Sequence, residues 1–280
     1  MTGSLAFDIS RVDDKTRIKA EDLVAIEEPL EIQLSSATAE GAAAKSISIT
    51  MRTPGDDREL ALGFLLTEGI IQSAAQVTSV THTGPAAEDG LQNTIRVELR
   101  AGVDVALDKL QRHFYTTSSC GVCGKASLDA LYVSGQESLG KYSTTFSRAV
   151  IVALPDRVRA QQPLFSATGG LHAAAIFTAD GEIVVVKEDV GRHNATDKVI
   201  GALLESEQLP GHEFGLLVSG RASFELIQKA LVADIPFLAA VGAPSSLAVQ
   251  TARKFDMTLV GFLRDGTFNI YAGASRIGQD

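Results

Sequence analysis

The chain has 280 residues, of which 45% are apolar and 21% are charged, so it can bury a sizeable core without disulfides or metals. This composition excludes disordered, collagenous and disulfide-scaffold proteins. Acidic residues outnumber basic residues by 34 to 25, which gives a formal net charge of −9 and disfavours a general nucleic-acid binder, because such proteins neutralise phosphates with Lys and Arg.

We expect no membrane segment, because no stretch reaches about 18 consecutive apolar residues. The first residues also lack the apolar run of a secretory signal peptide. The two cysteines, Cys120 and Cys123, are too few for a disulfide scaffold, and this count suits a reducing compartment. The sequence therefore predicts a cytoplasmic protein that binds neither membranes nor nucleic acid.

The first part of the chain predicts a small α+β domain over residues 23–115, preceded by a polar tail or edge strand over residues 1–22. Apolar and polar residues alternate at 30–34, 46–50 and 93–99, which is the period of half-buried strands. A turn at 54–56 introduces a helix over 58–70, with Asp56 or Asp57 as its N-cap.

The second part predicts an α/β domain over residues 148–275 with a mostly parallel sheet. Strands at 171–177 and 182–187 are joined by an Asp-Gly turn, which indicates a hairpin. Three units of strand, polar loop and helix follow, with helices at 195–204, 222–232 and 247–255. Strands at 258–263 and 267–271 end the series. The loops after successive strands should then share one sheet edge.

The segment between these domains, 116–147, contains both thiols, in the sequence Cys-Gly-Val-Cys-Gly. A helix predicted over 125–133 would place the cysteines near a helix N-terminus, where the positive dipole favours the reactive thiolate. Three other interpretations remain open: two small buried side chains, a redox dithiol, or half of a zinc site completed by His172 or His193. We expect a mobile loop without a structural metal.

Polar residues also follow three apolar strands of the second domain. Arg192 and His193 follow the strand at 183–187, Arg264 follows the strand at 258–263, and the strand at 215–218 leads into Ser219, Gly220 and Arg221. A single arginine in such a loop is usually just solvated, and Asn194 could simply cap a helix. Three arginines at one sheet edge instead favour an anion site. We expect His172 to be a core histidine whose hydrogen bonds are satisfied.

Several of these segments together resemble the FdhD family, the sulfurtransferase accessory proteins of formate dehydrogenase. They are residues 116–125 (TTSSCGVCGK), 168–174 (TGGLHAA), 188–201 (EDVGRHNATDKVIG), 219–223 (SGRAS) and 259–271 (LVGFLRDGTFNIY). The resemblance covers nearly the whole chain after about the first 20 residues.

This resemblance implies a sulfur carrier with Cys120 as the persulfide residue and Cys123 as an auxiliary thiol. Sulfur would come from a cysteine desulfurase and pass to the molybdenum cofactor, bis-molybdopterin guanine dinucleotide, before that cofactor enters formate dehydrogenase apoenzyme. GDP would mimic part of the cofactor. The implied cofactor-binding stretch is Phe262, Leu263, Arg264, Asp265, Gly266 and Thr267.

The resemblance also implies a homodimer and a cytidine-deaminase-like, three-layer core. Deaminase chemistry is not implied, because His172 is followed by Ala173 and Ala174 where deaminases have their H-x-E zinc signature. Two other functions remain open at this point: a dithiol oxidoreductase, and a non-catalytic chaperone for the cofactor.

Overall fold

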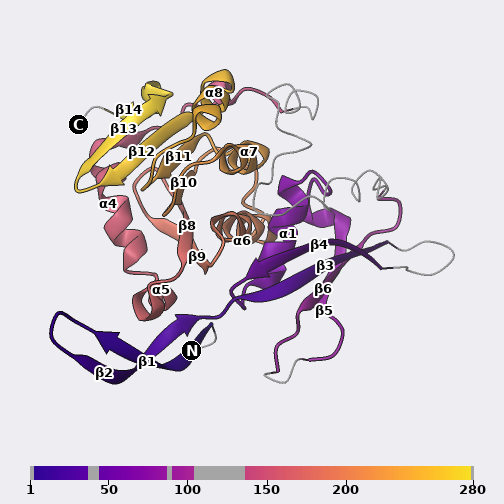
Figure 1. Cartoon of the computed structure of the whole chain (residues 1–280). Coiled ribbons are helices and arrows are strands. Elements are labelled where there is room, and N and C mark those ends of the chain that lie inside the picture. Colours follow the sequence, from indigo (N-terminus) through magenta and orange to yellow (C-terminus); the bar gives the residue numbers. More distant parts are fainter. Residues whose placement is uncertain (1–2, 37–43, 87–89, 104–135, 279–280) are drawn as a thin grey trace.

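The computed structural model of the chain describes residues 3–36, 44–86, 90–103 and 136–278 (Figure 1). The predicted Cys120–Cys123 site and the helix predicted over 125–133 lie outside the described residues. Among the described helices, none is long and apolar enough to cross a membrane.

The N-terminal residues form an antiparallel hairpin of β1 (Ser4–Val12) and β2 (Arg17–Ala25). Its base packs against α5 (Pro163–Thr168), where Gly3 lies beside Leu164. The rest of the hairpin projects away from the other elements at the lower left of Figure 1. The predicted tail or edge strand over residues 1–22 is thus a two-stranded arm.

The small domain contains a four-stranded sheet in the order β4-β3-β6-β5. The strands are β3 (Glu28–Ser36), β4 (Lys45–Arg52), β5 (Val77–His82) and β6 (Thr94–Leu99). Alternate apolar residues, including Ile32, Leu34 and Val97, point to one face of this sheet and are fully buried. The strands predicted at 30–34, 46–50 and 93–99 are present, whereas β5 was missed.

Helix α1 (Asp57–Thr67) covers the apolar face of the small sheet, with Asp56 as N-cap. The helix was predicted to continue to residue 70, and it stops earlier because Gly69 adopts a positive φ of 71°. The amide of Gly69 then donates to the carbonyl of Leu66, and the amide of Ile70 donates to the carbonyl of Leu65, which closes the helix end.

The second domain is built on a six-stranded sheet in the order β13-β12-β11-β10-β8-β9. Its strands are β8 (His172–Phe177), β9 (Ile183–Asp189), β10 (Gly215–Val218), β11 (Phe237–Ala240), β12 (Thr258–Arg264) and β13 (Thr267–Ala272). The expectation of a mostly parallel sheet was wrong. Of the five pairs of neighbouring strands, only β10–β11 and β11–β12 are parallel, and the other three are antiparallel.

The reason for this difference is the β8–β9 hairpin, which inserts β8 between β9 and β10. Because β8 is antiparallel to both neighbours, β9 still runs in the same direction as β10, β11 and β12. The carboxyl ends of these four strands therefore share one edge, so the loops that follow them lie along the same edge, as predicted. We call it the carboxyl edge.

Helices cover both faces of the large sheet and give it three layers (Figure 1). One face packs against α4 (Arg148–Arg159), and α5 lies near the end of the sheet. The other face packs against α6 (Arg192–Glu205), α7 (Phe224–Val232) and α8 (Ser246–Lys254), close to the predicted helices. The remaining elements are short: β7 (Phe146–Ser147), β14 (Ile277–Gly278), and 3-10 turns at Ala74–Gln76, Leu139–Lys141 and Ala274–Arg276.

The two domains meet where α1 crosses α6, and two glycines set their separation. A Cβ atom on Gly63 of α1 would overlap the carbonyl oxygen of Asp197, and one on Gly201 of α6 would overlap the carbonyl oxygen of Glu59. The helix backbones are therefore close enough that neither position has room for a methyl group. One hydrophobic core runs through this crossing, from the small sheet to the large one.

We predict that Gly63→Ala lowers the free energy of unfolding by at least ~2 kcal/mol, because the added methyl group must separate two packed helices. Urea unfolding of the full chain measures the change. Gly170→Ala is the matched control, since its Cβ would lie 3.7 Å from Ala25, an ordinary contact. Equal stability of the two variants would contradict the close crossing.

Candidate functional site

A buried ion pair positions the first turn of α6 at the carboxyl edge. The ammonium of Lys198 lies 2.8 Å from the carboxylate of Asp189, and both side chains are fully buried. Lys198 also donates to the carbonyls of Thr53 and Glu188, at 3.0 and 3.2 Å. The pair thus joins the end of β9, the body of α6 and the residues that follow β4.

Asn194 lies in the first turn of α6 and is not its N-cap, which is Gly191. Its amide donates to the carbonyl of Met51 at 2.7 Å and to Asp189 at 3.0 Å, and its oxygen accepts from Thr50. The alternative interpretation, in which Asn194 simply caps the helix, was therefore wrong. The residue ties the small sheet to the site.

Arg192 and His172 meet over Gly220, although the sequence separates them widely. A Cβ atom on Gly220 would lie 3.4 Å from the imidazole of His172 and 3.5 Å from Cδ of Arg192, so both side chains lie within contact distance of this position. His172 is half-buried at the start of β8 and lies at the carboxyl edge. The expectation of a satisfied core histidine was therefore wrong.

Arg192 has a buried polar atom that makes no hydrogen bond within the described part of the chain. Its Nε is buried and has no hydrogen-bond partner among the described residues. A buried guanidinium N–H without an acceptor is costly, so such a group is a candidate for binding an anionic ligand. Burial and the charge of Arg192 both lower the pKa of His172. At neutral pH, the positive charge in this pair belongs to Arg192.

His193 is positioned by contacts with the next unit of the chain. Its Nε2 lies 3.2 Å from the hydroxyl of Ser223 and 4.0 Å from the carboxylate of Glu225. Burial, with the nearby charges of Arg192 and Lys229, lowers the pKa of His193 to about 4. The imidazole is therefore neutral near pH 7. It can donate one hydrogen bond and accept another, and it carries no positive charge.

The loop at 219–221 is continuous with the next two loops of the edge. The hydroxyl of Ser219 accepts from the amide of Ala173 at 2.8 Å, which anchors the loop to β8. The carbonyl of Gly220 accepts from the amide of Gly242, whose own carbonyl accepts from the amide of Phe262. These backbone hydrogen bonds connect the loops after β10 and β11 to the end of β12 along the carboxyl edge. Arg221 is exposed beside them.

Residues 264–267 form the tight turn between β12 and β13. Asp265 and Gly266 have positive φ values of 51° and 70°, as a two-residue hairpin turn of this kind requires. Arg264 is exposed, and its guanidinium carbon lies 5.7 Å from the centroid of the Phe262 ring. Thr267 is also exposed and its hydroxyl donates to the carbonyl of Arg264.

Leu263 differs from the other predicted cofactor-binding residues, because its side chain is fully buried in the core beneath α4. The Leu263 side chain therefore belongs to the core on which the 264–267 turn rests. The structure thus places Arg192 beside Gly220, and backbone hydrogen bonds connect Gly220 through Gly242 to Phe262. Arg264 lies further along the edge, since β12 is four strand spacings, about 19 Å, from β9.

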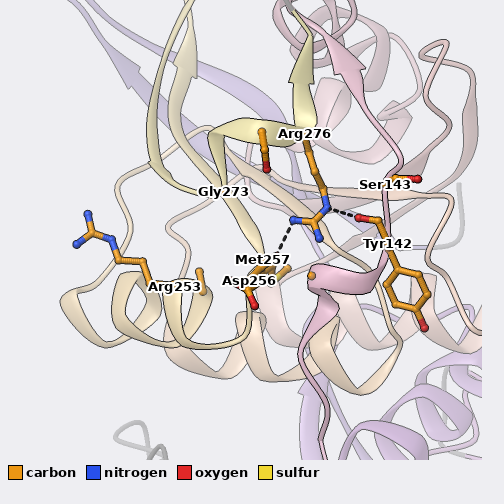
Figure 2. Close-up of a pocket in the computed structure, with 10 residues that line it drawn as sticks. Tyr142, Ser143, Arg253, Asp256, Met257, Gly273 and Arg276 are labelled. Carbon is orange, nitrogen blue, oxygen red and sulfur yellow. Dashed lines mark hydrogen bonds between the residues drawn. The ribbon is translucent and has the colours of Figure 1, made fainter.

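A separate cavity of about 530 Å³ lies at the opposite edge of the sheet, where β12 begins (Figure 2). The Arg276 guanidinium enters it but donates to three backbone carbonyls, those of Leu139, Tyr142 and Asp256. Arg276 therefore joins three chain segments. Sequence reasoning identified neither this cavity nor the role of Arg276, and no local motif indicates them.

We predict that the stability of the protein falls as pH drops from about 6.5 to about 4, partly through His193. Over this range the unfolded chain binds a proton on the imidazole and the folded chain does not, so protonation favours unfolding; above about pH 6.5 the contribution is constant. Urea unfolding at about pH 7.5 and about pH 5 measures the loss. The His193→Gln variant should lose less stability between these two values than the wild type, and an equal loss would contradict the lowered pKa.

Comparison with known proteins gives one family. A model of the FdhD/NarQ family matches residues 25–278. The chain is 51% identical over 263 residues to the sulfur carrier protein FdhD of Mycolicibacterium paratuberculosis, covering 93% of this chain and 94% of that protein. It is 48% identical over 272 residues to the FdhD of Streptomyces coelicolor, covering 96% and 94%.

The fold has a counterpart among solved structures. A crystal structure from Desulfotalea psychrophila, of a protein assigned as a formate dehydrogenase accessory protein, superposes with a TM-score of 0.74 at 24% identity. It covers 99% of this chain and 100% of the other. The family model matches nearly the whole chain, and the sequence identities to two FdhD proteins extend over 94% of their lengths. The chain therefore belongs to the FdhD/NarQ family.

Proposed function

We propose that this protein is a cytoplasmic sulfur carrier for formate dehydrogenase, with Cys120 as the residue that bears the persulfide. The observation that carries the sulfur proposal is the family match to relatives named sulfur carrier proteins, combined with a chain whose two thiols both lie in one Cys-Gly-Val-Cys-Gly segment. A carrier needs a thiolate that two different proteins can reach, and the polar, glycine-containing sequence around Cys120 suits this need.

The proposed transfer conserves electrons. The Cys120 thiolate attacks the terminal sulfur of a persulfide on a cysteine desulfurase, a new S–S bond forms, and the desulfurase thiolate leaves. On release, the Cys123 thiolate attacks the inner sulfur of the Cys120 persulfide, so the S–S bond of the persulfide breaks, a Cys120–Cys123 disulfide forms and the outer sulfur leaves at the oxidation level of sulfide. This sulfur passes to the molybdenum cofactor, bis-molybdopterin guanine dinucleotide, before the cofactor enters formate dehydrogenase apoenzyme. A thiol reductant then supplies the two electrons that return the disulfide to the dithiol.

The carboxyl edge is the proposed binding site for this cofactor, which is the cargo of the protein. Its phosphates are anionic, and the half-buried Arg192, whose Nε has no hydrogen-bond partner among the residues that the structure describes, supports an anion at this position. Arg221 and Arg264 add exposed positive charge further along the edge. In the turn, the carboxylate of Asp265 would accept from the N–H groups of guanine.

Within the site, the proposed roles differ by residue. Ser219 and Gly220 give hydroxyl and backbone groups at the centre of the edge, beside Arg192. The neutral His193 orients Ser223 and donates or accepts one hydrogen bond. The homodimer that the resemblance implies stays a prediction.

We predict that Cys120→Ala prevents sulfur loading, whereas Cys123→Ala retains it. The measurement is the intact mass of the protein after incubation with a cysteine desulfurase and cysteine, where loading adds one sulfur atom that a reductant removes. Omitting the desulfurase is the control. Loading of the Cys120 variant but not of the Cys123 variant would reverse the two roles.

Two further results of this measurement would point to another function. A loss of two hydrogens without added sulfur would indicate a dithiol oxidoreductase. An unchanged mass, with GDP still bound, would indicate a cofactor chaperone that carries no sulfur.

We predict that Arg192→Ala and Arg264→Ala each weaken GDP binding about ten- to 150-fold, since each loses a charge-assisted hydrogen bond worth about 1.5–3 kcal/mol. Calorimetric titration with GDP measures the affinity, and ADP tests whether guanine is recognised. Sulfur loading of Cys120 should be unchanged in both variants.

Arg253→Ala is the matched control for this titration, because Arg253 lines the cavity at the opposite edge of the sheet. It should bind GDP as tightly as the wild type. Wild-type affinity in the Arg264 variant would remove the β12–β13 turn from the site, and equal affinities for GDP and ADP would exclude guanine recognition.

A further inference from the structure

Two side chains at the carboxyl edge lie beside the same glycine and come from different elements. His172 begins β8 and pairs with Asp189, the last residue of β9, whereas Arg192 is the first residue of α6. A Cβ atom on Gly220 would lie 3.4 Å from both Cε1 and Nδ1 of His172 and 3.5 Å from Cδ of Arg192. The imidazole and the arginine side chain are therefore close neighbours.

The imidazole of His172 makes no hydrogen bond and no ion pair within the part of the chain that the structure describes. Two other histidines have partners: Nε2 of His82 lies 3.0 Å from the carboxylate of Asp57, and Nε2 of His193 lies 3.2 Å from the hydroxyl of Ser223. In either tautomer, a neutral imidazole has one N–H donor and one acceptor. The half-buried ring of His172 therefore has a donor that a ligand can use.

The positive charge of Arg192 is not neutralised by the nearby Asp189. The carboxylate of Asp189 accepts from Lys198 at 2.8 Å, from the amide of Gly191 at 2.8 Å and from Asn194 at 3.0 Å. Among the described residues, no carboxylate forms an ion pair with Arg192, and its buried Nε has no acceptor. This part of the edge thus has a guanidinium without a counter-ion, next to an imidazole without a partner.

We propose that His172 is a ligand-binding residue and that its imidazole donates to the same oxyanion as Arg192. The inference rests on the proposed anion site at the carboxyl edge and adds to it a residue that the sequence analysis placed in the core. A phosphate or sulfate group has several oxygens, so one group can accept from a guanidinium and an imidazole together. Arg192 then supplies a permanent charge and His172 a donor that can be protonated.

The groups around His172 make its protonation depend on the ligand. Burial is the largest cause that lowers the pKa of His172, the charge of Arg192 on α6 is the next, and Asp189 at the end of β9 acts in the opposite direction. The loop after β10 lies beside the ring through Gly220, which has no charge, and His193 is neutral near pH 7. Arg192 is thus the charge that a bound anion would offset.

Anion binding should therefore be accompanied by proton uptake. An anion next to His172 offsets the charge of Arg192 and accepts a hydrogen bond from the imidazolium, so it raises the pKa of His172. The complex then binds more protons than the free protein at mildly acid pH. By linkage, the affinity for the anion should increase as pH falls below about 7.

The test is calorimetric titration of the full-length chain with sodium sulfate, with ionic strength kept constant by sodium chloride. Sulfate does not titrate near neutral pH, so a change of affinity with pH belongs to the protein. The wild type should bind sulfate about five- to tenfold more tightly at about pH 6 than at about pH 7.5, the effect of raising one pKa by roughly one unit. His172→Gln keeps an N–H donor but cannot be protonated near neutral pH, so its affinity should be nearly equal at both pH values. Arg192→Ala should weaken binding at both.

His82→Gln is the matched control, because it makes the same substitution on β5 of the small sheet, outside the carboxyl edge. It should keep the pH dependence of the wild type. A wild-type affinity that does not change with pH would overturn the inference, and so would wild-type pH dependence in His172→Gln.

These two outcomes leave the proposed function in place, since sulfur loading of Cys120 is measured by intact mass and the anion site by GDP binding. A wild type that binds neither sulfate nor GDP would overturn the anion site and the role of His172 together, without changing the result for sulfur loading.

Discussion

The close crossing of α1 and α6 is the constraint on which the rest of the structure depends. Gly63 and Gly201 each face a backbone carbonyl of the other helix, so the two helices are in direct backbone contact. A buried cluster stabilises the crossing: the ammonium of Lys229 from α7 donates to Thr67 of α1 and to Asp197 of α6, at 2.9 and 2.8 Å. Since breaking a buried pair leaves a charge uncompensated, α1, α6 and α7 are held as one unit. The small sheet is therefore fixed relative to the carboxyl edge of the large one.

This arrangement explains how a chain with a net charge of −9 presents local positive charge. Lys198 and Lys229 are buried and paired with Asp189 and Asp197, so they give structure to the site without facing a ligand. The lowered pKa values of His172 and His193 keep both imidazoles neutral near pH 7. The charge available to a bound anion therefore comes from arginine, whose guanidinium stays protonated at any physiological pH. A site of this kind should hold phosphate with little dependence on pH above neutrality.

Helices and strands that follow from a local pattern of apolar residues were predicted correctly from the sequence. Features that depend on contacts between residues far apart in the chain were not. The helices α6, α7 and α8 and the strands between them follow from apolar periodicity. The place of β8 does not, because either strand of a hairpin can pair with β10 and only packing selects one. The same holds for the site: Arg192 could be identified in the sequence as an arginine at a strand end, but its proximity to His172 depends on the insertion of β8. The hairpin was missed because alternation in a polar, two-faced ribbon is weak.

The N-terminal hairpin and the carboxyl edge are connected through α5. The base of the hairpin packs on Leu164 and lies beside Gly170, two residues before His172. The carboxylate of Glu188 accepts from the amides of Leu164 and Phe165 at the start of α5, at 3.0 and 2.7 Å, and Glu188 directly precedes Asp189. A short path thus runs from the hairpin base to the ion pair that positions Arg192, through a packing contact with Leu164, two hydrogen bonds to Glu188 and the peptide bond to Asp189. Because coupling between sites needs contiguous packed contacts, a surface that binds the hairpin is in a position to change the geometry of the anion site.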